Sequence, residues 1–247
     1  MSRRGAAFAA AVLALAAPAP AAGDYLVADL SDHRISITAG FTGADVLLFG
    51  TRGGEGDVVV VLRGPVSPVV VRRKDRSFGL WLNRAQVTFA DAPGYYSVAA
   101  SRPLEEIASP ELLAENEIGF DRLRLAASSA GAGADLEAFR AALLRNMERA
   151  RLYRAAVREI AFVGELLFRT TFAFPANVPT GVYRADVYLI ADGALVSKRT
   201  NLLVISKIGF EAALFDFANR QPLGYGLVAV LVALMAGWSA GVIFRKS

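Results

Sequence analysis

The chain has 247 residues, of which 54% are hydrophobic, and its 27 basic residues exceed its 23 acidic residues by four. All of that excess lies at the two ends, in Arg3, Arg4, Arg245 and Lys246, so the central part is electrically neutral and lacks the basic surplus that nucleic-acid binding needs. The absence of cysteine excludes disulfides, thiolate catalysis and cysteine-ligated metal centres.

Residues 1–22 have the three parts of a secretory signal peptide. Two arginines come first, an apolar stretch from Gly5 to Ala17 follows, and the small residues Ala19–Ala22 offer a cleavage site. We expect cleavage to leave a mature chain that begins near Gly23. The alternative is an uncleaved N-terminal anchor, but a stretch of about 13 residues is shorter than the roughly 20 that span a bilayer.

Residues 23–102 consist of short β-branched or alternating segments, separated by turns rich in Gly, Pro and Asp. The expected strands are Arg34–Thr38, Asp45–Gly50, Asp57–Leu62, Val66–Val71, Leu80–Leu82, Gln86–Phe89 and Tyr95–Ala100. Strands of this length and spacing predict an antiparallel β-sandwich or barrel.

A cluster of basic residues, Arg72, Arg73 and Lys74, follows one of these strands, and Trp81 lies shortly after it. One hypothesis is that these four residues contact an anion. The alternative is a solvated turn, or a charged edge that prevents sheet-to-sheet aggregation.

Residues 103–159 are interpreted as a helical insertion. Ser109 and Pro110 have the order of a helix cap and a first-turn proline, residues 128–133 read as a small-residue linker, and a long helix is predicted from Ala134 to about Val157. Arginines are scattered over its polar faces, at Arg140, Arg145, Arg149, Arg151, Arg154 and Arg158. A solvated helix side explains them most simply, and a surface that faces anions or lipid headgroups is the alternative.

Residues 160–207 return to strand patterns, and Asp192-Gly193 predicts a two-residue hairpin turn. A hairpin of this kind is typical of the closing strands of immunoglobulin-like sandwiches. We therefore expect a mainly β protein of the α+β class, in which helices interrupt one β-rich domain. The alternative is two small β domains joined by helices. In the juxtamembrane segment, residues 208–221, aromatic and aliphatic side chains predict an interfacial stretch on the bilayer surface.

Residues 222–244 are 23 residues without a charge and predict a transmembrane helix. A buried core helix is the alternative, but few soluble helices are apolar on every side for this length. Arg245 and Lys246 follow within the short tail, 245–247, and positive flanks stay in the cytoplasm. With the signal peptide, this predicts a single-pass membrane protein whose N-terminal domain lies outside the cytoplasm and whose C-terminus lies inside it.

Small residues recur every fourth position on this helix, at Ala229, Ala233, Gly237 and Gly241. Such a stripe lets helices approach closely. We expect it to contact a membrane protein partner or a second copy of the chain.

His33 is the sole histidine, so neither a zinc site nor a Ser-His-Asp triad is expected. We predict no catalytic residue, no cofactor and no enzymatic activity.

The chain resembles the uncharacterised alphaproteobacterial family of putative transmembrane proteins. The resemblance rests on the order of short motifs along nearly the whole chain, at Ile35–Ile37, Phe41–Gly43, Leu48–Gly50, Arg63–Pro65, Val71–Lys74, Gly79–Asn83, Pro93–Tyr96 and Ser101–Leu104. It offers no catalytic residue to transfer, and it implies an accessory role beside an exporter of the sulfite or organosulfonate type.

Two functional hypotheses follow. The first is a non-enzymatic periplasmic domain, tethered by one helix, that assists an inner-membrane protein. The second is a tethered binding module for a small anion or an envelope ligand.

Overall fold

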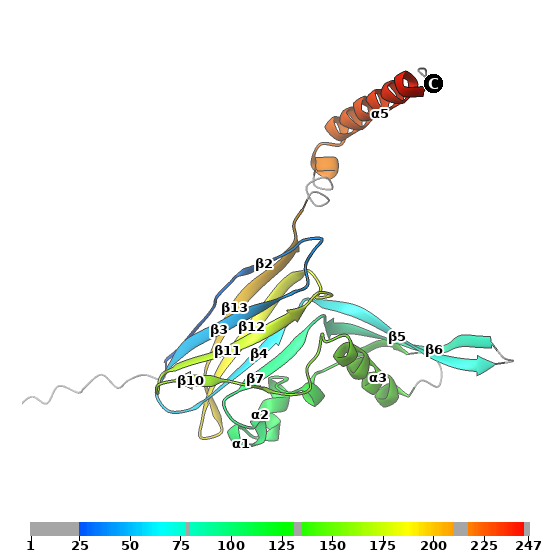
Figure 1. Ribbon diagram of the computed structural model, residues 1–247. Coiled ribbons are helices and arrows are strands. Elements are labelled where there is room, and N and C mark those ends of the chain that lie inside the picture. Colours follow the sequence, from blue (N-terminus) through cyan, green and yellow to red (C-terminus); the bar gives the residue numbers. More distant parts are fainter. Residues whose placement is uncertain (1–24, 78–79, 131–134, 210–216, 245–247) are drawn as a thin grey trace, which may run out of the picture.

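The computed structural model describes residues 25–77, 80–130, 135–209 and 217–244. Strands in three sheets make up about half of this part of the chain, and the C-terminal helix α5, Pro222–Phe244, follows them (Figure 1). The predicted signal peptide and the cytoplasmic tail lie outside the described residues. The prediction of a mainly β chain with some helices is confirmed.

Two sheets pack face to face and form what we call the two-sheet body. The first sheet has the order β1 (Tyr25–Leu30), β3 (Gly43–Gly53), β11 (Leu167–Pro175) and β10 (Ala161–Val163). The second has the order β2 (Arg34–Ile37), β13 (Ala194–Lys207), β12 (Gly181–Ala191), β4 (Asp57–Arg63), β7 (Tyr96–Ala100) and β9 (Arg158–Glu159). Among the strand pairs of these two sheets in the described residues, β2–β13 and β7–β9 are parallel and the others are antiparallel. The immunoglobulin-like strand arrangement stays a prediction.

The core between these sheets follows from the period-two pattern of the strands. In β11, buried and more exposed residues alternate, so Phe168 and Phe172 point inward. They pack against Val187 and Leu203 of the second sheet. Burying each large apolar side chain stabilises the fold by about 1.5–3 kcal/mol.

Strand β4 is buried on both faces, which explains its unbroken run of β-branched residues. Val58 and Val60 face the core between the sheets. Val59 and Val61 face a second core beneath the helices α1 (Leu104–Ile107) and α2 (Pro110–Glu115). The predicted cap of α2 is present, because the Ser109 hydroxyl accepts a hydrogen bond from the Leu112 N–H at 3.3 Å. A short 3-10 helix, Phe120–Arg122, follows.

A long hairpin leaves the body as an arm, formed by β5 (Val66–Ser77), β6 (Leu80–Pro93) and β8 (Ala127–Ala130) (Figure 1). Here the strands are longer than the sequence pattern predicts: β5 continues through the basic cluster, and β6 joins two expected strands into one. Part of the expected linker pairs with β6 as β8. Helix α3, Leu136–Arg149, packs on the arm through Phe139 and Leu143.

The long helix ends earlier than predicted, at Arg149 rather than near Val157. The Leu152 N–H bonds the Met147 carbonyl at 2.9 Å, and the Arg151 N–H bonds the Glu148 carbonyl at 2.8 Å. This is the Schellman pattern that ends a helix, in which the residue after the C-cap takes a left-handed backbone conformation. Arg151 has a φ of 59° and occupies that position. Helical spacing therefore no longer governs where the later arginines lie.

Helix α5 confirms the C-terminal membrane anchor. Among the described residues, it is the one helix long and apolar enough to cross a bilayer, and none of its most apolar window is buried. Its 23 residues span about 34 Å at a rise of about 1.5 Å per residue, against a hydrocarbon layer of about 30 Å.

One end of the two-sheet body is connected to this anchor, and we call it the exit end. Strand β13 finishes there at Lys207, and Gly181 pairs with Ile205 beside it. Pro175 precedes Gly181 by a short loop and pairs with Gly43. The first residues of β3 and the last residues of β11 therefore lie at the exit end.

Candidate functional site

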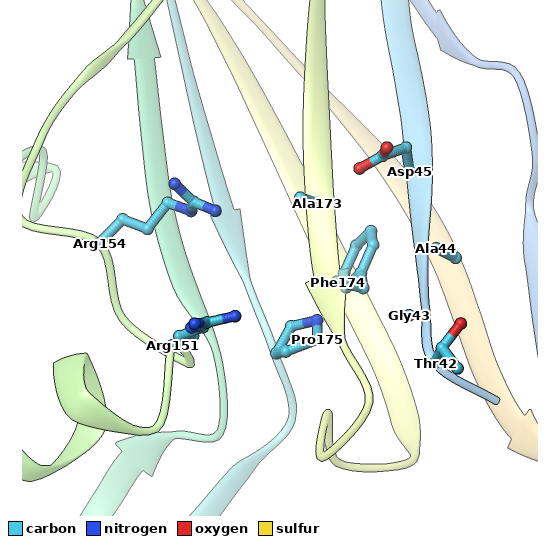
Figure 2. A pocket seen from close by; sticks show the side chains of 9 residues that line it. All are labelled: Thr42, Gly43, Ala44, Asp45, Arg151, Arg154, Ala173, Phe174 and Pro175. Atoms are coloured by element: carbon cyan, nitrogen blue, oxygen red, sulfur yellow. The ribbon is translucent and has the colours of Figure 1, made fainter.

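A cavity of about 360 Å³ opens at the exit end, between the first sheet and the segment that follows α3 (Figure 2). One wall is formed by the start of β3 and the end of β11, at residues 42–45 and 173–175. Arg151 and Arg154 form the other wall. We call this space the arginine cavity.

The sheet side of the arginine cavity follows from strand alternation. Val46 and Leu48 point into the core, so Asp45 lies on the outer face of β3. Its cross-strand partner on β11 is Ala173. The methyl group of Ala173 leaves space that a larger side chain would fill. The Asp45 carboxylate therefore faces an opening.

The segment that carries the two arginines is fixed to β7 and to the loop after β11. The Tyr96 N–H donates to the Leu152 carbonyl at 2.9 Å, and the Arg154 N–H donates to the Tyr96 carbonyl at 3.1 Å. Asn177 holds the end of α3, because its Nδ2 donates to the Ala150 carbonyl at 3.1 Å. The buried Tyr153 hydroxyl donates to a carbonyl at the end of β6 at 2.6 Å. These bonds fix the backbone from which both arginine side chains extend.

Positive charge in the arginine cavity has no paired carboxylate. Within the described part of the chain, neither Arg151 nor Arg154 forms an ion pair, and Arg154 Nε is buried without a hydrogen-bond partner. Figure 2 shows both guanidinium groups directed from one wall and the Asp45 carboxylate from the other. Burial raises the pKa of the neighbouring Tyr95 phenol, while the charge of Arg154 acts to lower it. The cavity can hold an oxyanion through charge-assisted hydrogen bonds.

A larger cavity, of about 920 Å³, lies among the turns at the opposite end of the body. Both arginines of its lining already have partners within the protein. Arg102 binds Asp57 through two hydrogen bonds and holds the pKa of that carboxyl below its usual value. Arg52 lies 4.4 Å above the Phe162 ring. This arrangement reads as turn stabilisation, so the arginine cavity is the better candidate site.

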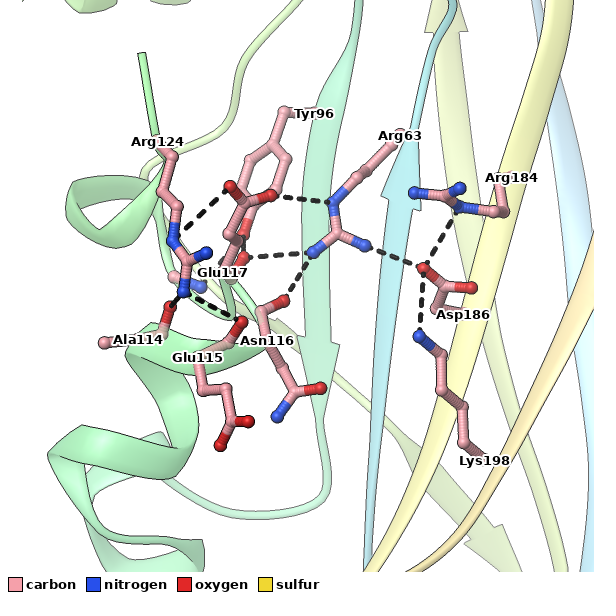
Figure 3. Close-up of polar contacts among 11 residues, drawn as sticks. Arg63, Tyr96, Ala114, Glu115, Asn116, Glu117, Arg124, Arg184, Asp186 and Lys198 are labelled. Carbon is pink, nitrogen blue, oxygen red and sulfur yellow. Dashed lines mark hydrogen bonds and ion pairs between the residues drawn. The ribbon is translucent and has the colours of Figure 1, made fainter. Parts of the chain in front are cut away.

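The most buried ion pair joins β4 to β12 (Figure 3). Arg63 Nη1 donates to Asp186 Oδ2 at 2.7 Å, with only 10% and 1% of the two side chains exposed. Arg63 Nη2 also donates to the Asn116 carbonyl at 2.6 Å. The Tyr96 hydroxyl donates to the Glu117 carbonyl at 2.7 Å. The cluster fastens the end of α2 to the second sheet, so its role is structural.

The predicted anion residues of the arm are spread along its ladder. Arg72 lies opposite Gln86 and its Nε donates to Gln86 Oε1 at 3.4 Å. The ladder pairs Arg73 with Ala85, Lys74 with Asn83 and Trp81 with Arg76. Arg72 and Arg73 are exposed. A ligand contact at these four residues stays a prediction.

The small-residue stripe lies along α5. Ala229, Ala233, Gly237 and Gly241 are all exposed. Apart from the adjacent residues and the backbone of the same helix turns, no atom of the described chain lies within 4 Å of the position that a Cβ would take at Gly237 or Gly241. The stripe is therefore free for a neighbour, and the helix–helix contact stays a prediction.

His33 lies in the open, with 60% of its side chain exposed and Nε2 3.2 Å from Asp29 Oδ1. Among the residues that the structure describes, no three His, Asp or Glu side chains gather as metal ligands. The absence of a cofactor and of catalysis stay predictions.

The sequence predicted Arg151 and Arg154 on a solvated helix side, with a surface that faces anions or lipid headgroups as the alternative, and it did not single out Asp45 or Ala173. On a continuous helix, Arg151 and Arg154 would lie three residues apart on one face. Such a helix gives no reason to expect either side chain beside β3. No sequence signal marks the left-handed residue that redirects them.

Comparison with known proteins gives one match. The sequence model of the family described as "Putative transmembrane protein (Alph_Pro_TM)" matches residues 25–246. No curated protein and no solved structure matches the chain.

Proposed function

The chain belongs to this family of putative transmembrane proteins, and from that premise we propose that it is a non-enzymatic accessory protein that works beside a second protein of the bacterial inner membrane. The observation that carries the proposal is the exposed small-residue stripe of α5. In its more specific form, which draws on the family resemblance, the partner is an exporter of the sulfite or organosulfonate type. A second copy of the chain is the other candidate partner.

The stripe supports this proposal because lipid tails give helices no hydrophobic reason to associate. Association in a bilayer depends on close van der Waals packing, which small residues allow. Gly237 and Gly241 form a small-xxx-small pair, and Ala233 and Ala229 continue it toward the start of the helix. The two-sheet body then lies beside the extracytoplasmic parts of the partner.

Replacing Gly237 and Gly241 with leucine is expected to abolish co-purification of the partner from mildly solubilised membranes. Two isobutyl side chains on the stripe would hold the helix surfaces apart. The measurement is quantitative mass spectrometry of proteins crosslinked in the membrane and captured with the full chain.

The matched control places leucines at Ala236 and Ala240. These two positions have the same four-residue spacing, on a face rotated by about 100°. The control should keep the partner. Equal capture by the Gly237/Gly241 variant and the control would remove the stripe from the proposal.

Orientation is a second expectation of this proposal. Since the chain has no cysteine, single cysteines report their side of the membrane without background. Ala155→Cys, at an exposed loop position, is expected to react with a membrane-impermeant maleimide in spheroplasts, and Ser247→Cys only after the membrane is permeabilised. The reverse pattern would place the two-sheet body in the cytoplasm.

The second candidate function is a tethered binding module for a small ligand. The guanidinium groups of Arg151 and Arg154 favour it, because no carboxylate of the described residues forms an ion pair with either of them, and a bound anion can take that place. Isothermal titration of the full chain in nonionic detergent with small oxyanions tests it. Absence of heat at millimolar ligand would leave the accessory role alone.

A further inference from the structure

We propose that the arginine cavity binds a small zwitterion, whose oxyanion lies between Arg151 and Arg154 and whose ammonium group faces Asp45. This inference rests on the binding-module function and adds the chemical class of its ligand. A phosphoethanolamine group is the simplest example. It occurs as a free metabolite-sized molecule and as a lipid headgroup, which share this chemistry.

The oxyanion half of the argument rests on Arg154. Its Nε is buried without a hydrogen-bond partner among the described residues. An atom enclosed in this way is out of a ligand's reach, but Arg154 lines the cavity and its guanidinium forms no ion pair or hydrogen bond within the described residues, so its Nη atoms can donate charge-assisted hydrogen bonds to a ligand oxygen. Arg151 lies on the same wall and brings a second guanidinium to the opening.

Arg151 gives an independent reason, because its backbone is in the left-handed region at a φ of 59°. Glycine is the usual residue at this position after a helix, since side chains are strained there. An arginine at such a position points to a use for its side chain. The left-handed backbone at Arg151 directs its guanidinium toward the cavity. A residue that continued the helix would direct its side chain elsewhere.

The ammonium half of the argument rests on Asp45. Within the described residues, no ion pair or hydrogen bond occupies its carboxylate. It enters the cavity from the wall opposite the arginines (Figure 2). A plain anion would be repelled by it, whereas a ligand with an ammonium group satisfies both walls.

Size supports a headgroup rather than a larger molecule. The cavity of about 360 Å³ is at the lower end of the roughly 300–1,000 Å³ range of ligand pockets. Gly43, Ala44 and Ala173 add little apolar bulk to its sheet wall, and the ring of Phe174 is buried in the core, which leaves Pro175 as the larger apolar side chain there. A short, highly charged ligand fits this lining better than an extended apolar one.

The test titrates the full chain in nonionic detergent with three probes: O-phosphoethanolamine, inorganic phosphate and ethanolamine. We expect O-phosphoethanolamine to bind at least about tenfold more tightly than either of the others, because only it engages both walls. Arg151→Gly should lower that affinity about tenfold or more without lowering the melting temperature, since glycine relieves the backbone strain. Arg145→Ala, an exposed arginine of α3 outside the cavity, is the charge-matched control and should bind normally.

Asp45→Asn separates the ligand class from the binding function. It should weaken O-phosphoethanolamine and strengthen inorganic phosphate, because the carboxylate attracts one probe and repels the other. If both affinities rise together, the site is a simple anion site: the zwitterion inference falls and the binding module stands. If no probe binds, or Arg151→Gly binds as the parent does, the binding module at this cavity falls as well.

Ala173→Val tests the space itself without changing charge. The two methyl groups of valine fill the space beside Asp45. Valine is favoured in β-strands, so β11 should tolerate the change. Binding of O-phosphoethanolamine should fall about tenfold or more while the fold is kept. Unchanged binding would place the ligand elsewhere and overturn the inference.

The source of the ligand is decided in nanodiscs. If the natural ligand is a lipid headgroup, soluble O-phosphoethanolamine will bind more weakly in phosphatidylethanolamine discs than in phosphatidylglycerol discs. Equal affinities identify a free zwitterion. Both results keep the zwitterion inference, provided that Arg151→Gly removes the binding in each disc.

Discussion

A chain that ends at Gln221 is expected to leave the membrane fraction and to appear in the soluble fraction. The truncation removes α5, whose 23 residues carry no charge. In a membrane helix, each Leu, Ile, Val or Phe favours insertion by about 0.3–0.6 kcal/mol, and the summed effect makes release of an inserted helix effectively irreversible. The measurement is fractionation of cells, followed by alkaline extraction of the membranes.

The control replaces α5 with an unrelated apolar helix of equal length that lacks the small-residue stripe. This chain should remain in the membrane after alkaline extraction and should lose the partner that the parent chain captures. Retention of the truncated chain after alkaline extraction would show that α5 is not the anchor. Retention that alkali reverses would instead locate peripheral binding in the rest of the chain, including the predicted interfacial segment.

Asp186→Asn is expected to destabilise the two-sheet body by about 3–5 kcal/mol. The Asp186 side chain is 1% exposed. Its carboxylate accepts hydrogen bonds from Arg63 Nη1 and from Thr200 Oγ1, each at 2.7 Å. Removing one partner of a buried ion pair leaves the other charge uncompensated, which costs about this amount. For a domain of this size, the melting temperature should fall by roughly 6–20 °C. Thermal unfolding of the full chain in nonionic detergent, followed by circular dichroism, measures it.

Two control variants show whether the loss of stability comes from the buried ion pair. Lys198→Ala removes a cation that lies 3.9 Å from the same carboxylate but is 43% exposed, so it should cost at most about 1 kcal/mol. Arg63→Leu combined with Asp186→Leu should recover much of the stability, because no lone charge remains buried. An Asp186→Asn protein as stable as Lys198→Ala would contradict the structural role assigned to the pair.

Local patterns predicted much of the secondary structure. Alternation in β11 and the Asp192-Gly193 turn are short-range signals, and the structure has the strand and the hairpin where they indicate. The arm differed because pairing with a partner strand can extend a strand through polar residues. Arg72 and Arg73 lie beyond the end of the predicted strand at Val71, yet the β5–β6 ladder continues across them.

The end of α3 shows a different limit. From Ala134 to Val157 the residues favour helix, and nothing local marks Arg151 as a left-handed position. Its neighbours decide the matter: Leu152 and Tyr153 are held at the start of β7 and cannot continue the helix. Tertiary contacts therefore overrode helix propensity, as they commonly do.

The sequence by itself determined the apolar anchor, the strand periodicity and the neutrality of the central chain, since each depends on neighbouring residues or on composition alone. Only the tertiary structure decided which charges meet. Arg63 and Asp186 are 123 residues apart in the chain. Asp45 faces Arg151 and Arg154 only because β3, β11 and the segment after α3 come together at the exit end. Such meetings depend on strand order and on where a helix stops, and no local pattern carries that information.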